Sequence, residues 1–221
     1  MKAIEIQITE CPRDAMQGIK EWIPTEHKIK YLNALLECGF DVLDFGSFVS
    51  PKAIPQMQDS PAVLAQLADS KTKLLAIIAN SRGAFDAAQH ERIAILGYPF
   101  SISETFQLRN TNSTLEQALF QLDEIAAICS TNNKQLRIYL SMGFGNPYGE
   151  PWSVALVTET LQRFRDTGIR IVMLTGDNKT TAAAVASRPR LAAAASRRGN
   201  PSGRGMTCPP SRSVSAGAVP R

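Results

Sequence analysis

The sequence predicts an α/β protein, because short apolar runs alternate with longer segments whose apolar residues repeat every three or four positions. This alternation is typical of parallel strands joined by helices. Polar residues directly follow the first two runs, and the functional groups of α/β barrels gather at the carboxyl ends of strands. We therefore expect a partial (βα) barrel of the TIM type, with about six of the eight units that close it. The predicted strands are 3–8, 41–45, 74–79, 92–97, 136–142 and 169–174.

The predicted helices have recognisable ends. Apolar residues at helical spacing after the first strand run up to Gly39, and glycine suits the end of a helix. Ser113 and Glu116 predict a capping box at the start of an apolar stripe that ends at Cys129. A further helix is predicted over about 153–167.

The composition favours a globular body followed by a separate tail. Hydrophobic residues make up 44% of the 221 residues, and the net charge is +4. All 20 acidic residues lie in 1–178 beside 16 Lys and Arg, so the body is acidic, which argues against nucleic acid as its partner. We predict an incomplete barrel domain over 1–178 and a low-complexity, disordered, basic C-terminal tail over 179–221. The tail is either a nucleic-acid-binding arm or the product of a shifted reading frame; its lack of aromatic residues favours the second.

Cellular location is predicted from what the sequence lacks. It has no apolar run of about 18 residues or more and no signal-peptide layout at its start, so we expect a cytoplasmic protein without a membrane partner. The four cysteines show no metal-binding spacing and are expected to be free thiols.

The candidate site follows the first two predicted strands. Arg13 and Asp14 come just after the first strand, where a guanidinium can neutralise a substrate carboxylate or enolate and a carboxylate can bind a hard cation. Asp44 stands at the end of the second strand, so its carboxylate is expected to converge with them. The alternative interpretation of Arg13 and Asp14 is a surface turn with a local ion pair.

Several segments resemble one family. They are ECPRDAMQ at 10–17, SFVSPKAIPQM at 47–57, and shorter matches at 103–104, 110–113, 139–141 and 145–149. Together they resemble the 3-hydroxy-3-methylglutaryl-CoA lyases, which belong to a metallolyase group built on TIM barrels. The resemblance covers about 3–165.

The resemblance implies a chemistry and a role for each matched residue. It implies cleavage of 3-hydroxy-3-methylglutaryl-CoA to acetyl-CoA and acetoacetate, with an acyl-CoA substrate and a divalent cation, Mg²⁺ or Mn²⁺. Asp14 is then a metal ligand, Arg13 a catalytic residue that stabilises negative charge on the substrate, and Gln17 a substrate-binding residue. Asp44 takes a catalytic position that the family usually fills with glutamate, one methylene longer.

The sequence also departs from that family. The family's metal-binding His-x-His strand and the reactive cysteine of its glycine-rich loop have no counterpart, since His27 and His90 fall in helical segments and Cys208 in the tail. A catalytically inactive fragment or fusion product is therefore the alternative to an impaired lyase. An open barrel also leaves a strand edge unpaired, so poor solubility or a homo-oligomer is expected.

A second resemblance begins where the first ends. Residues 168–188 resemble a phosphorylation-domain segment of P-type cation ATPases, with TGDN at 175–178. The DKTGT motif that carries the phosphorylated aspartate is absent, so no transport function is implied.

Overall fold

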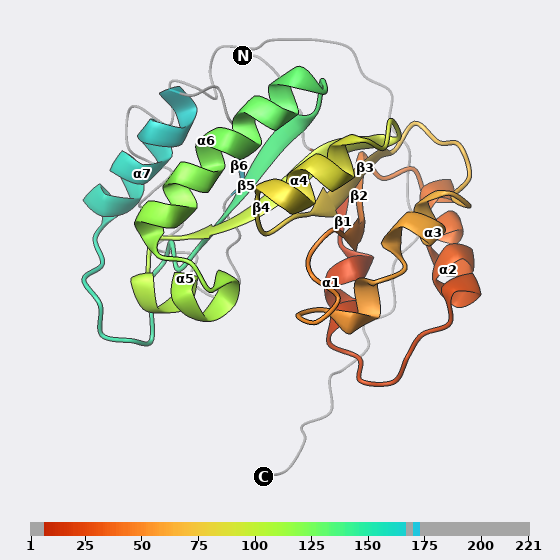
Figure 1. Ribbon diagram of the computed structural model, residues 1–221, viewed down its shortest axis with the longest axis horizontal. Helices are drawn as coiled ribbons and strands as arrows, with labels where there is room; N and C mark the ends of the chain where they lie inside the picture. The colour runs from red at the N-terminus through yellow and green to blue at the C-terminus, as the bar shows by residue number, and fades with distance from the viewer. Residues whose placement is uncertain (1–6, 167–169, 173–221) are drawn as a thin grey trace, which may run out of the picture.

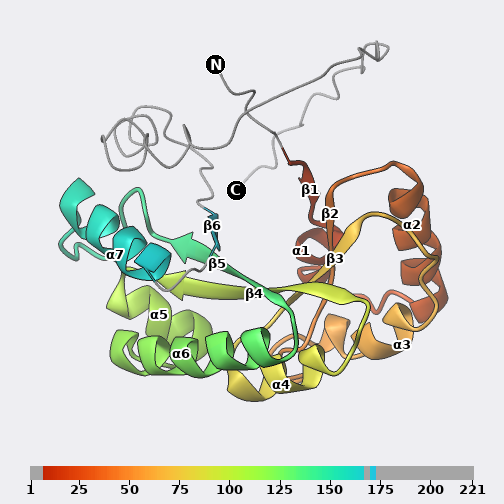
Figure 2. The same cartoon turned by 90° about the horizontal axis from the view of Figure 1, so that it is seen from above.

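The computed structural model describes residues 7–166 and 170–172. Its strands form one parallel sheet in which each strand pairs with the next along the chain, in the order β1 to β6. Figure 2 shows the sheet as an open curve, with helices along its convex side. The predicted partial barrel is thus confirmed. The strands are β1 Thr9–Glu10, β2 Val42–Ser47, β3 Lys73–Ile77, β4 Ile93–Ser101, β5 Gln135–Ser141 and β6 Arg170–Val172.

The connections between strands are helical, which is what parallel pairing requires. Figure 1 shows α2 and α3 over one end of the sheet, α4 and α6 over its middle, and α7 beside β5 and β6. The helices are α1 Pro12–Gln17, α2 Thr25–Glu37, η1 (a 3₁₀ turn) Pro55–Met57, α3 Ser60–Leu64, α4 Ser81–Ala88, α5 Glu104–Thr111, α6 Leu115–Thr131 and α7 Val154–Asp166.

Two apolar clusters lie on opposite faces of the sheet. Successive side chains of a strand point to opposite faces, so Leu43 and Phe45 of β2 join the large cluster beneath the helices. Val42 instead joins Leu75 and Ile95 in a small cluster on the concave face. Burial of each large apolar side chain contributes about 1.5–3 kcal/mol, so the outer cluster supplies most of the stability. The small inner cluster leaves room for polar side chains on the concave face.

The capping box of α6 lies one residue later than the sequence predicted. The backbone N–H of Gln117 donates to Oγ1 of Thr114 at 3.1 Å, and that of Thr114 donates to Oε1 of Gln117 at 3.0 Å. Ser113 and Glu116 were therefore the wrong pair. The preceding helix ends at Asn112 in the left-handed region, with φ of 53°, and this ending sets the register of the next helix. Gly39, with φ of 75°, follows the end of α2 as predicted.

Some predictions fall outside the described residues. The basic tail at 179–221 and most of the ATPase-like segment at 168–188 belong to this group, and so does most of the first predicted strand, 3–8. Among the residues that are described, no helix is long and apolar enough to cross a membrane.

Replacing Gly97 by alanine is expected to lower the free energy of unfolding by about 1–3 kcal/mol, because an added methyl would collide with the side chains packed around Gly97. A Cβ on Gly97 would stand 2.6 Å from Cδ1 of Ile77 and 2.9 Å from Cε2 of Tyr139. Urea unfolding measures the loss. Gly18→Ala is the matched control, because a Cβ there meets nothing within 4 Å and its φ of −85° suits alanine. Equal losses in the two variants would contradict this account of the concave face.

Candidate active site

Helix α1 carries three of the predicted site residues. It begins with Pro12 directly after β1, and proline suits a first helical turn because its missing N–H would have no partner there. Pro12 and Met16, four residues apart, are buried on one side of the helix. Arg13, Asp14 and Gln17 are left on its other sides, at the carboxyl end of β1.

Arg13 forms a buried ion pair with Asp44 of the neighbouring strand. Its Nη2 donates to Oδ2 of Asp44 at 2.6 Å, and its Nε lies 3.1 and 3.2 Å from the two carboxylate oxygens. The Asp44 side chain is 1% exposed and that of Arg13 12%. This two-pronged arrangement fixes the plane of the guanidinium as well as its position. The predicted convergence of the first two strand ends is present.

The opposite edge of the guanidinium faces the rim. Nη1 of Arg13 donates to Oδ1 of Asp14 at 3.0 Å and to Oε1 of Gln17 at 2.9 Å. Nε2 of Gln17 donates to the same Asp14 oxygen at 3.1 Å, which closes a triangle of side chains. The Asp14 side chain is 66% exposed, so its carboxylate is open to a ligand. The local ion pair between Arg13 and Asp14 is present, but it lies in helix α1 and Arg13 is also bound to the buried Asp44.

The two members of the ion pair differ in what burial does to them. Burial raises the pKa of Asp44 above its usual range, and the hydrogen bonds and charge of Arg13 oppose that rise. Burial acts to lower the pKa of Arg13, but the hydrogen bond and charge of Asp44 outweigh it, so this pKa is raised. Arg13 therefore stays cationic, and its charge stabilises the ionised form of Asp44, which burial disfavours.

Two polar residues of β5, which the sequence analysis did not single out, share the concave face. Arg137 is 4% exposed, and its Nη1 donates to Oγ1 of Thr9 at 3.2 Å. Nε of Arg137 and the hydroxyl of Tyr139 are buried without a hydrogen-bond partner in the described part of the chain. Burial raises the pKa of Tyr139 to about 12, so its hydroxyl stays protonated. Their spacing of two within an apolar strand was the available signal, because it places both on one face.

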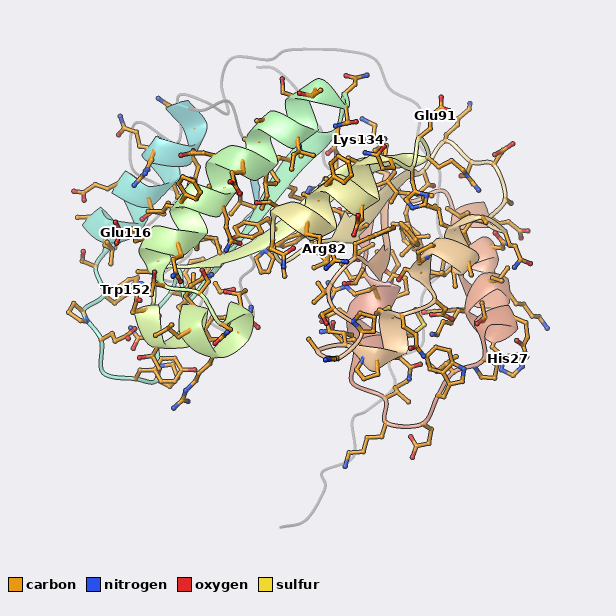
Figure 3. All side chains as sticks on the ribbon, in the orientation of Figure 1. His27, Arg82, Glu91, Glu116, Lys134 and Trp152 are labelled. Carbon is orange, nitrogen blue, oxygen red and sulfur yellow. The ribbon has the colours of Figure 1, made fainter. Side chains whose placement is uncertain are left out.

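The histidines lie apart from this site. His27 is exposed in the first turn of α2, and Figure 3 shows it at the outer side of that helix. The ring of His90 packs against that of Phe48, with centroids 5.3 Å apart. Within 7–166 and 170–172, no group of three or more His, Cys, Asp or Glu side chains could hold a metal ion. Asp14 alone does not make a site, so the described residues do not fit a complete metal centre.

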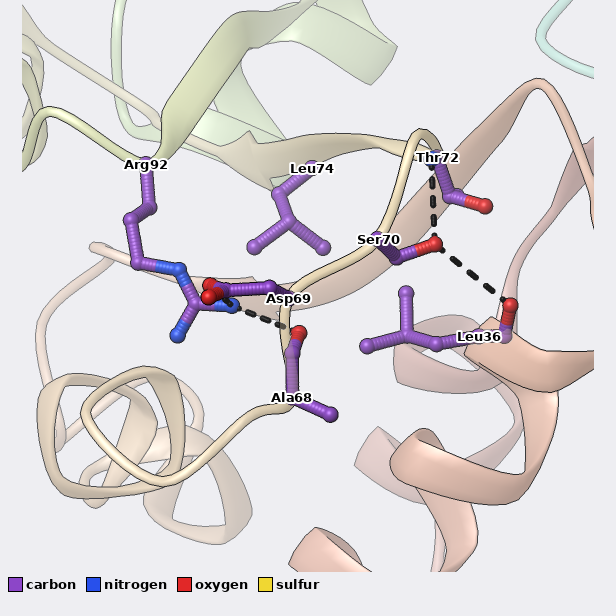
Figure 4. Close-up of a pocket in the computed structure, with 7 residues that line it drawn as sticks. All are labelled: Leu36, Ala68, Asp69, Ser70, Thr72, Leu74 and Arg92. Atoms are coloured by element: carbon purple, nitrogen blue, oxygen red, sulfur yellow. Dashed lines mark hydrogen bonds and ion pairs between the residues drawn. The ribbon is translucent and has the colours of Figure 1, made fainter.

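A pocket at the other end of the strands has a structural explanation. Figure 4 shows it between the start of β3 and the ends of α2 and α3, with Arg92 and Asp69 in its wall. The Arg92 guanidinium donates to the carbonyls of Leu64, Leu67 and Ala68 at 2.7–3.0 Å, which satisfies the carboxyl end of α3. The amino-terminal face of such a sheet serves stability, whereas chemistry belongs to the opposite rim.

The curled parallel sheet, with charged groups at the carboxyl ends of its first strands, defines a partial α/β barrel with a candidate site at its rim. No family model matches the chain. It is 31% identical to the cytoplasmic 3-hydroxy-3-methylglutaryl-CoA lyase of Danio rerio over 175 residues. The match covers 77% of this chain and 51% of that protein. Over 167 residues it is 32% identical to the mitochondrial hydroxymethylglutaryl-CoA lyase of Homo sapiens, covering 74% and 50%.

Solved structures agree with the sequence relatives. A lyase of this name from Brucella melitensis superposes with a TM-score of 0.78 at 26% identity, covering 89% of this chain and 71% of that one. A lyase of the same name from Acinetobacter baumannii, in complex with coenzyme A and 3-methylmalate, superposes with a TM-score of 0.76 at 29% identity. The match covers 82% of this chain and 61% of that one.

Over the matched residues, the chain is similar in sequence and fold to hydroxymethylglutaryl-CoA lyases. It spans about half the length of the curated relatives it matches. The comparisons do not bear out the ATPase resemblance at 168–188.

Arg13→Ala is expected to lower the free energy of unfolding by about 3–5 kcal/mol near neutral pH, because it leaves Asp44 as an uncompensated buried charge. This loss should shrink as the pH falls. Without Arg13 the raised pKa of Asp44 rises further, so the folded state binds a proton before the unfolded state does, and acid favours folding. Urea unfolding from about pH 5 to pH 8 measures the trend.

The control for this experiment is the double variant Arg13→Ala/Asp44→Asn, which has no carboxylate to titrate. In this double variant the free energy of unfolding should not recover as the pH falls. A deficit of Arg13→Ala that is constant or grows on acidification contradicts a buried Asp44 held ionised by Arg13.

Proposed function

We propose that this chain carries the substrate-facing part of a carbon–carbon lyase that cleaves 3-hydroxy-3-methylglutaryl-CoA to acetyl-CoA and acetoacetate. The names of its relatives and the coenzyme A complex of one structural neighbour support this substrate class. The single observation that carries the proposal is the guanidinium of Arg13, fixed by a buried carboxylate on one edge and directed to the rim on the other. Such a preorganised cation stabilises negative charge without having to reorganise during the reaction.

The proposed reaction develops negative charge that a cation such as Arg13 can stabilise. A base removes the proton of the tertiary hydroxyl, and the alkoxide that is left collapses to the ketone of acetoacetate as the adjacent carbon–carbon bond breaks. The electron pair of that bond passes to the acetyl-CoA part as an enolate, which is then protonated at carbon. Both anions are oxygen-centred, and we propose that Arg13 stabilises them through its rim-facing edge.

The other predicted residues have distinct proposed roles. Gln17 binds the substrate carboxylate beside Arg13, since its amide already lies within the triangle at the rim. Asp44 acts through Arg13 and does not touch the substrate, because its side chain is 1% exposed behind the guanidinium. It is therefore a positioning residue in this proposal. Asp14 is the exposed carboxylate that would offer one ligand to Mg²⁺ or Mn²⁺, and we assign no step to the ion.

A second candidate function is an inert acyl-CoA-binding relic of such an enzyme. The observation in its favour is that the described residues supply no complete set of metal ligands. The two candidates share the Arg13 site and differ in turnover, so one assay separates them.

The full chain with Mg²⁺ or Mn²⁺ is expected to release acetyl-CoA from 3-hydroxy-3-methylglutaryl-CoA above the protein-free rate. Arg13→Met should lower kcat by about 10²–10³, the usual effect of removing one donor to a developing oxyanion. Coupled spectrophotometric detection of acetyl-CoA measures both rates. Arg82→Met, on the exposed side of α4 (Figure 3), is the matched control and should leave the rate unchanged.

The negative outcome is equally informative. Absence of turnover with either ion, together with acyl-CoA binding that Arg13→Met weakens, would overturn the lyase proposal in favour of the inert relic. Absence of both turnover and binding would overturn both candidates.

A further inference from the structure

A buried amide secures the loop that follows α1. The side chain of Gln56, in η1, is only 4% exposed. Its Nε2 donates to the carbonyls of Ile19 at 3.0 Å and Glu21 at 2.8 Å, and its Oε1 accepts the backbone N–H of Ile23 at 3.1 Å. One side chain thus satisfies three backbone groups of the loop between α1 and α2, all more than 30 positions away in sequence.

A buried ammonium in turn secures the backbone that carries Gln56. Lys28 of α2 is 2% exposed, and its Nζ donates to the backbone carbonyl of Gln56 and, at 2.7 Å, to Oδ1 of Asp59. The other Asp59 oxygen accepts the hydroxyl of Thr25 at 2.8 Å. The same Nζ lies 3.9 Å from the centre of the Trp22 ring, which belongs to the loop that Gln56 holds. Lys28 and Gln56 therefore act on one loop from two sides.

Helix α1 depends on such external support. It has six residues, and its first residue is preceded by Cys11, which makes no capping hydrogen bond. Helices shorter than about 12 residues are marginal on their own and take their stability from packing. Helix α1 packs against β2 and η1, and Figure 1 shows it beside the strands at the start of the sheet. The loop held by Gln56 leaves directly from its carboxyl end.

We infer that Gln56, supported by Lys28, is a positioning residue that sets how α1 presents Arg13 to Asp44. Its relevance to catalysis rests on the proposed function. The coupling between η1 and the Arg13–Asp44 ion pair does not. If the coupling exists, weakening the Gln56 contacts makes the Nε–H of Arg13 exchange faster with solvent while the sheet stays folded.

The coupling is tested by hydrogen exchange in the full 221-residue chain. The Arg13 Nε–H signal is assigned in ¹⁵N-arginine-labelled protein by its loss in Arg13→Lys. Gln56→Glu keeps the side-chain shape but turns a carboxylate oxygen toward the carbonyls of Ile19 and Glu21. The exchange rate of the Arg13 Nε–H should rise about tenfold, the factor that lost buried hydrogen bonds give to a local opening. Amide protons of β4 should keep their rates.

Asn33→Ala is the matched control. The Asn33 amide secures another loop in the same manner, donating to the carbonyl of Gln66 at 3.4 Å and accepting the N–H of Ala68 at 2.7 Å. This variant should leave the exchange rate of the Arg13 Nε–H within about twofold of the unmodified chain, since it acts on a different local opening.

Two outcomes would overturn the inference. One is an unchanged Arg13 rate in Gln56→Glu, and the other is an equal acceleration of the β4 amides, which would mean global loosening. If Gln56→Glu does not fold, Gln56→Asn is measured in its place, because it keeps the amide and shortens its reach. No substrate is present, so this measurement and the turnover assay fail independently.

Discussion

The site depends on the buried ion pair between Arg13 and Asp44. Removing two charges from water costs several kcal/mol per ion, and only good geometry with further hydrogen bonds offsets that cost. Here the guanidinium reaches both carboxylate oxygens with two nitrogens and uses the third nitrogen on the rim. Loss of either partner leaves the other buried without its main partner of opposite charge. The pair therefore ties the short helix α1 to the sheet and orients the cation at the same time.

The open sheet keeps barrel curvature without being closed. Strands β1 and β5 are separated by three strands in the sheet, yet Arg137 of β5 reaches Thr9 of β1 at 3.2 Å. A flat sheet, with strands about 4.8 Å apart, would hold these two residues far beyond the length of an arginine. The curl is therefore an intrinsic property of the described strands. It brings the polar groups of β5 toward Asp44, so one concave face holds all of them.

Sequence reasoning succeeded where the signal was local and failed where it was tertiary. The strands β2 to β5 were visible as apolar runs, and Arg13, Asp14 and Gln17 as a motif at a strand end. Arg137 was missed because its spacing of two from Tyr139 indicates a shared face but not which face of the sheet is concave. The structural roles of Lys28 and of Gln56, which lies within the segment 47–57, were missed for a related reason. Their partners lie 28 to 37 positions away, so no periodicity within a window reveals them.

The charge balance of the concave face bears on the proposed ligand. Two guanidinium groups, Arg13 and Arg137, face two carboxylates, Asp44 and Asp14, so the described site is close to neutral. An anionic acyl-CoA substrate entering such a site needs one more source of positive charge, since a partly desolvated anion is costly without a partner. Asp14 is exposed and could offer one ligand to a cation, but it already accepts from Arg13, and the described residues supply no complete set of metal ligands. The near neutrality of the described groups is thus a physical reason why the proposed substrate needs positive charge beyond that of Arg13 and Arg137.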